Sequence, residues 1–258
     1  MMKTKIMILC AIALFTNASA QNSAEGGTTA GSVIYEEVAR LEIKLEGDAA
    51  QFADQIPKEQ VSQKILYFNP DISLYRLLET SSNDDVMPQT TGHMTVRMKI
   101  SGLNDKIFCD MKNRKKIEQK EFMTRMFLID GELIRPEWKI TGNQQLISGY
   151  NCQEASCIDN GRKISAWFSP SIPVSTGPAG FGDLPGLILM VDIENGKRLI
   201  TAKSVNTVLE DAGILEIPKE GKKVSQEEYK KMVDEKMKEM GEENGGGGNV
   251  HIIIRGGE

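Results

Sequence analysis

Short runs in which apolar and polar residues alternate recur along most of this chain. In residues 94–100, Met, Val, Met and Ile alternate with Thr, Arg and Lys, the period of a strand with one buried face. Further runs that read as strands lie at 41–45, 64–68, 72–78, 122–129, 133–134, 138–140, 162–168, 187–193 and 198–205. Short strands at this spacing favour an antiparallel sheet.

Turn-forming residues separate several of these runs. Asn69-Pro70-Asp71 cannot continue a strand ladder and predicts a hairpin turn. Asp130-Gly131 is the strongest short-range hairpin signal in the chain, and Asn195-Gly196 predicts a turn before the run that starts at Arg198.

One segment near the C-terminus predicts a helix. Ser225 and Glu228 have the spacing of a capping box. One face of this helix would carry the apolar side chains of Tyr229, Met232, Val233, Met237 and Met240. Core packing explains such a face, with an adaptable methionine-rich binding surface as the alternative. The sequence thus predicts a mainly β (α+β) fold, a curved antiparallel sheet or half-barrel with one C-terminal amphipathic helix.

The N-terminus has the pattern of an export signal. Lys3 and Lys5 precede an apolar stretch, residues 6–15, which ends before the small residues Ala18-Ser19-Ala20. A membrane-spanning helix needs about twenty apolar residues, twice the length found here. We therefore expect a signal peptide at 1–20, cleavage after Ala20, and a periplasmic or cell-envelope location. A lipid anchor on Cys10 stays an alternative, although Leu9 stands where lipid transfer needs a small residue.

Composition divides the rest of the chain into three parts. Residues 21–31 are small and polar, which predicts a disordered N-terminus. Residues 32–240 form a single β-rich domain in this interpretation. Residues 241–258 are a glycine-rich linker followed by the β-prone tail Val250–Arg255. The tail either docks as a strand on its own sheet or is presented to a partner by strand addition.

The charge balance disfavours nucleic acid as a partner. Of 31 basic residues, Lys3 and Lys5 leave with the signal peptide, so 29 remain against 36 acidic ones. The densest basic cluster is Lys112, Arg114, Lys115 and Lys116, which reads as a solvated loop or strand face.

Cysteine and histidine usage gives no metal site. After cleavage, Cys109, Cys152 and Cys157 allow at most one disulfide, and the spacing weakly favours Cys152 with Cys157. His93 and His251 are far apart in sequence and read as ordinary surface or strand residues. We expect no metal and no cofactor.

The densest run of special residues lies between Trp167 and Asp192, with glycines and prolines from Pro170 to Gly186. This block, together with Ile147–Cys152, Gly161-Arg162 and Ala166–Ser169, resembles the GLPGLI family of exported Bacteroidota proteins. Asp183 stands where the family hexapeptide has glycine. The resemblance implies a signal peptide, an envelope location and a β-rich fold, and it implies no catalytic residues and no defined biochemical role.

Residue patterns favour binding over catalysis. The glycines at 177, 180 and 182 have the wrong order for a dinucleotide fingerprint, and the chain lacks the motifs of serine and zinc hydrolases. We expect a non-catalytic binding or carrier protein for an apolar ligand or peptide. Its candidate binding residues are Trp167, Phe168, Phe181, Gly182, Asp183, Leu184, Pro185 and Gly186. The alternative is an interaction partner of an outer-membrane transport or assembly complex that uses the C-terminal tail. Hydrolase and metal-handling roles are weaker hypotheses, and ligand and oligomeric state stay open.

Overall fold

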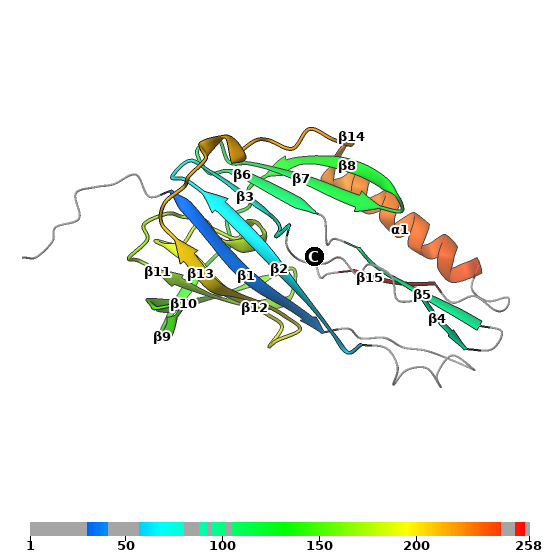
Figure 1. The fold of residues 1–258 in the computed structure, drawn as a ribbon, viewed down its shortest axis with the longest axis horizontal. Helices are drawn as coiled ribbons and strands as arrows, with labels where there is room; N and C mark the ends of the chain where they lie inside the picture. Colours follow the sequence, from blue (N-terminus) through cyan, green and yellow to red (C-terminus); the bar gives the residue numbers. More distant parts are fainter. Residues whose placement is uncertain are drawn as a thin grey trace, which may run out of the picture.

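The computed structural model describes residues 30–40, 57–79, 88–91, 94–101, 105–243 and 251–255. Most of these residues lie in strands, and one α-helix lies near the C-terminus (Figure 1). The predicted mainly β fold with one C-terminal helix is therefore confirmed. The elements are β1 (Gly31–Arg40), β2 (Glu59–Phe68), β3 (Ile72–Leu77), β4 (Pro88–Thr91), β5 (Met94–Ser101), β6 (Lys106–Asp110), β7 (Lys115–Phe122), β8 (Arg125–Glu132), β9 (Lys139–Ile147), β10 (Tyr150–Asp159), β11 (Arg162–Ser169), η2 (Pro178–Gly180), β12 (Leu187–Ile193), β13 (Arg198–Asn206), η3 (Ala212–Ile214), β14 (Lys222–Ser225), α1 (Gln226–Glu243) and β15 (His251–Arg255).

Twelve strands form one curved sheet that does not close, in the order β14-β8-β7-β6-β3-β2-β1-β13-β12-β11-β10-β9. Strands β1 and β2 run through its middle, between the β10–β13 side and the β6–β8 side (Figure 1). Neighbouring strands are antiparallel except β14 and β8, which are parallel. The sheet is thus mixed rather than purely antiparallel, because the chain reaches β14 through the long connection from β13.

A second sheet contains the C-terminal tail. Its order is β15-β5-β4, and β15 lies parallel to β5, with His251 opposite Arg97 and Arg255 opposite Ser101. The tail therefore docks within its own chain, on β5 rather than on the large sheet. His93, the predicted strand at 41–45 and the N-terminal segment 1–29 lie outside the described residues.

Two of the predicted turns are confirmed and one is wrong. Asn69 accepts the backbone N–H groups of Asp71 and Ile72 through its Oδ1, and Gly196 lies at a left-handed φ of 87° between β12 and β13. Asp130-Gly131, in contrast, lies inside β8. The β7–β8 hairpin turns at Met123-Thr124, where both residues have positive φ. These are the backbone angles of a type I′ turn without its usual Asn or Gly.

Helix α1 starts with the predicted capping box. Glu228 donates its backbone N–H to Ser225 Oγ at 3.1 Å, and its carboxylate accepts the Ser225 N–H at 2.8 Å. The helix packs through Tyr229 and Val233 against a small apolar cluster on β7 and β8, so this part of its apolar face serves core packing. The side chains of Met237 and Met240 lie outside the described residues. Within the described ranges, no helix has the length and apolar character needed to span a bilayer.

The main core lies on one face of the sheet, which we call the inner face. Fully buried side chains alternate with half-buried ones along β1 and β11, as expected for strands with one face packed. Residues of this core include Val33, Tyr35, Leu66, Phe168, Ile188 and Ile200. The outer face of β3, β6, β7 and β8 is covered by a smaller cluster that includes Leu215 from the segment after β13.

A hydrogen bond from Tyr35 links strands across this core. The Tyr35 hydroxyl is fully buried and donates to the backbone carbonyl of Ile188 at 2.6 Å. We predict that Tyr35→Phe lowers the free energy of unfolding by about 1–2 kcal/mol, because the Ile188 carbonyl loses a buried donor. Chemical denaturation measures the change, with Tyr150→Phe, a half-buried tyrosine on β10, as the matched control. Equal stability of the two variants would contradict the role given to this bond.

Candidate functional site

The Gly- and Pro-rich block between β11 and β12 forms a folded loop, residues 170–186, which we call the motif loop. Ile172, Val174 and Leu184 are almost completely buried in the inner core. The loop also pairs with the start of β12, since Leu187 N–H donates to Ile172 O at 2.9 Å and Ile188 N–H to Thr176 O at 3.0 Å. The motif loop therefore fills one end of the inner face.

Gly186 and Asp183 adopt backbone conformations that few side chains tolerate. Gly186 has φ 157°, and a Cβ built there would lie 2.2 Å from the Ser169 carbonyl oxygen, so no larger residue fits. Asp183 has φ 62°, a left-handed conformation that costs roughly 1–2 kcal/mol for a residue with a Cβ. This is the position at which the resembling family has glycine. Other contacts must therefore hold Asp183 in place.

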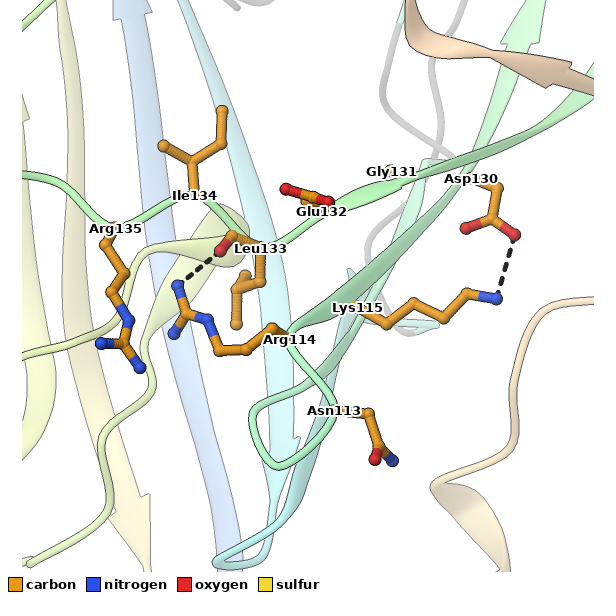
Figure 2. A pocket seen from close by; sticks show the side chains of 9 residues that line it. All are labelled: Asn113, Arg114, Lys115, Asp130, Gly131, Glu132, Leu133, Ile134 and Arg135. Carbon is orange, nitrogen blue, oxygen red and sulfur yellow. Dashed lines mark hydrogen bonds and ion pairs between the residues drawn. The ribbon is translucent and has the colours of Figure 1, made fainter.

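An ion pair with Arg114 supplies those contacts. The Arg114 Nη1 lies 2.8 Å and 3.0 Å from the two carboxylate oxygens of Asp183. The other guanidinium nitrogen, Nη2, donates to the backbone carbonyl of Leu133, as Figure 2 shows. Both charged side chains are about three-quarters buried, at 28% and 25% exposed, which limits screening by solvent. Arg114 thus ties the motif loop to the end of β8.

Trp138 makes a second set of contacts with the motif loop. Its indole N–H donates to the Gly182 carbonyl at 2.9 Å, and its ring lies 6.5 Å from that of Phe181, centroid to centroid. Trp138 belongs to the linker 133–138 between β8 and β9. The motif loop is therefore held both by the β6–β7 turn and by this linker.

An open hollow of about 770 Å³ lies beside these ties (Figure 2). It is lined by Asn113, Arg114, Lys115, Asp130, Gly131, Glu132, Leu133, Ile134 and Arg135. Lys115 Nζ pairs with Asp130 Oδ2 at 3.0 Å, whereas the side chain of Arg135 is 73% exposed and approaches Asp183 only at 3.9 Å. Ile134 is 74% exposed. The hollow thus combines charged groups of both signs with one exposed aliphatic side chain.

The four apolar candidates, Trp167, Phe168, Phe181 and Leu184, lie in or against the main core. Phe168 and Leu184 lie in the packed core, and Phe181 lies half-buried against Trp138. Trp167 is half-buried and packs against the same core. Gly182, Asp183, Pro185 and Gly186 shape and fix the motif loop. Of the predicted site residues, Asp183 is the one tied directly to an arginine of the hollow.

The cysteines do not form the expected disulfide. Cys152 and Cys157 are buried free thiols, as is Cys109. Both lie on the extended strand β10, where five residues span roughly 16 Å. A disulfide needs Cα atoms within about 7 Å of each other, so these two residues cannot pair.

A row of buried and half-buried charges crosses the inner face. From β13 to β7, positive and negative side chains alternate in the order Arg198, Glu37, Lys64, Asp105, Lys120, Glu118 and Lys116. Arg198 Nε lies 2.9 Å from Glu37 Oε1, and the Tyr75 hydroxyl donates to Glu37 Oε2 at 3.1 Å. Buried charges of alternating sign compensate one another, as a low-dielectric interior requires.

The pKa values follow from this environment. Burial raises the pKa of Glu37, but Arg198 and Lys64 outweigh that effect and hold it below its usual value. Burial raises the pKa of Asp105 to about 6 despite the attraction of Lys120 and Lys64. One oxygen of Asp105, Oδ1, is buried without a hydrogen-bond partner. Asp105 is therefore the member of the row whose charge is least well compensated.

Sequence reasoning missed Arg114, Arg135 and Trp138 as site residues. A signal for Arg114 existed in the basic cluster from Lys112 to Lys116, which reads as a solvated surface when no acidic partner is in view. Its partner Asp183 lies 69 residues further along the chain. Among the described residues, no group of His, Cys, Asp and Glu is arranged to hold a metal ion.

Comparisons with known proteins agree with the fold and leave the role open. A family model described as a protein of unknown function (Porph_ging) matches residues 157–190, which fall inside the segment that carries the family resemblance. No curated protein matches. Two crystal structures of PNGF-II, in space groups P21 and C2, are similar with TM-scores of 0.52 and sequence identities of 19% and 20%. The match covers 80% and 79% of this chain but 33% and 32% of PNGF-II, so the chain spans about a third of that protein. The likeness shows a shared fold.

The Arg114–Asp183 pair is testable by a double-mutant cycle. We predict that Arg114→Leu and Asp183→Ala each lower the free energy of unfolding, with a coupling energy of roughly 1 kcal/mol. Asp183→Gly should cost less than Asp183→Ala, because glycine relieves the left-handed backbone strain while both lose the carboxylate. Urea denaturation of wild type, Arg114→Leu, Asp183→Ala, the double variant and Asp183→Gly measures these differences. Additive single effects would show that the pair contributes nothing.

Asp105 gives the protein a defined pH response. Its pKa is 3.8 in an unfolded chain and about 6 in the fold, so the folded state holds the proton more tightly. The cost of ionising Asp105 is therefore absent below about pH 4 and complete above about pH 6. We predict that Asp105→Asn raises the melting temperature relative to wild type, and that the difference grows by a few degrees between pH 4 and pH 7. Melting curves across this range test it; a difference that shrinks toward pH 7 would contradict the raised pKa.

Proposed function

We propose that this is an exported, non-catalytic binding protein of the periplasm or cell envelope, and that it holds its ligand in the hollow beside the motif loop. One observation carries the proposal: the hollow is built on fixed elements, because Arg114 joins Asp183 of the motif loop to Leu133 of the hollow's wall. A pre-formed wall lowers the entropy cost of binding. The export part rests on the N-terminal pattern from Lys3 to Ala20.

The chemistry of the hollow favours a peptide over an apolar small molecule. The apolar candidate binding residues Phe168 and Leu184 are packed in the core. The hollow instead offers Arg135, Glu132 and the exposed aliphatic chain of Ile134. A peptide supplies both charged and aliphatic groups for such a surface, whereas an acyl chain leaves the charged groups without partners.

The alternative role, a presented C-terminal tail that binds an outer-membrane complex, has less support. Every residue of β15, from His251 to Arg255, is paired with residues 97–101 of β5. A tail that is already a strand of its own chain must leave that strand or offer only its other edge.

Native mass spectrometry of the protein purified from a periplasmic fraction tests the proposal. We expect a mass that lacks residues 1–20 and a reproducible added mass from a bound ligand. Arg135→Ala should lower the occupied fraction, because the exposed guanidinium lines the hollow. Arg125→Ala, at the opposite end of β8, is the matched control and should leave occupancy unchanged.

Two results would contradict the proposal. One is a wild-type protein that shows no added mass under gentle conditions. The other is an added mass that Arg135→Ala and Arg125→Ala retain equally, which would place the ligand elsewhere.

A further inference from the structure

Strand β8 has a free edge where it borders the hollow. On one side β8 pairs with β7 along its whole length, from Arg125 to Glu132. On the other side β14 pairs with it only from Phe127 to Asp130, where Ser225 is the last residue in register. Helix α1 then begins at Gln226 and packs on the inner face. Within the described chain, nothing continues the sheet beside the last residues of β8.

The backbone groups of Glu132 point toward this free edge. Leu133 N–H donates to the Arg114 carbonyl at 3.0 Å, so the backbone groups of Leu133 face β7. Backbone groups of successive residues in a strand alternate between its two edges. The N–H and C=O of Glu132 therefore face away from β7. They lie on the β14 side of β8, beyond the last residue that pairs with β14.

The free edge and the hollow share residues. Gly131, Glu132, Leu133 and Ile134 are both the end of β8 with its continuation and a wall of the hollow. Figure 2 shows this stretch running along the hollow from Asp130 to Arg135. An added strand gains main-chain hydrogen bonds at an edge of this kind, and its side chains select among sequences.

We propose that the hollow takes an extended polypeptide segment, which adds to the end of β8 at Glu132 and carries an acidic residue and an apolar residue. The acidic side chain pairs with the exposed guanidinium of Arg135, and the apolar one covers Ile134, which is 74% exposed. This inference rests on the proposed function and names the ligand class for the same site.

Selection of a phage-displayed library of random twelve-residue peptides on the purified protein tests the inference. The Kd of an enriched peptide is then compared among wild type, Glu132→Pro and Glu132→Gln. Proline removes the N–H that faces the free edge, whereas glutamine keeps it and removes only the charge. We expect Glu132→Pro to weaken binding about tenfold and Glu132→Gln to change it less than about threefold.

If Glu132→Pro disturbs the fold, hydrogen exchange of the wild-type protein provides an independent test. Addition of the enriched peptide to wild type should slow exchange at residues 131–135 and leave β9, at the opposite edge of the sheet, unchanged. Enriched sequences should contain Asp or Glu together with an aliphatic residue.

Each opposite result overturns the inference. If no peptide is enriched, or if enriched peptides bind Glu132→Pro and wild type equally and protect no amide in 131–135, strand addition at β8 is wrong. The proposed function is judged separately, because a ligand detected by native mass spectrometry that depends on Arg135 supports the hollow without supporting an added strand.

Discussion

The ion pair between Arg114 and Asp183 is the constraint on which the candidate site depends. It joins a turn that follows β6 to a loop that precedes β12, two segments 69 residues apart in the chain. Because the same guanidinium also binds the Leu133 carbonyl, one side chain fixes the motif loop and the end of β8 together. A shift of either segment would leave a largely buried charge without its partner, which is costly.

The packing of the motif loop gives the most distinctive sequence in the chain a structural role. The motif loop inserts Ile172, Val174 and Leu184 into the inner core and so closes one end of the inner face. Its glycines allow backbone conformations and close contacts that a larger residue would prevent. The clearest case is Gly186, where the Ser169 carbonyl leaves no room for a Cβ. The surface proposed for a ligand lies beside the loop, next to the residues that Arg114 joins to it. The unusual residues of this chain thus form a structural loop next to the candidate site.

The fold could be predicted from local patterns, whereas the site depends on contacts between distant segments. Alternation along 162–168 and the nearly continuous apolar run at 187–193 predicted two core strands, and both strands contribute buried side chains to the core. The strand β7 was missed because its sequence, Lys115–Phe122, carries charges on the face that helps form the buried row, so it lacks a simple apolar period. Asp130-Gly131 failed as a turn because the pairing of β7 with β8 continues to Glu132, and tertiary pairing overrides a local signal. No local sequence pattern at Arg114 or Trp138 indicates that these residues contact the motif loop.

Hydrogen exchange of Arg114→Leu, compared with wild type, tests the central claim most directly. If the ion pair with Asp183 holds the motif loop and the end of β8 together, exchange should become faster in residues 131–138 and 177–186. It should stay slow in β1 and β2. Unchanged exchange in both segments would show that the loop and the hollow are held by other contacts. Faster exchange throughout the sheet would show that Arg114 supports the whole fold and not this site.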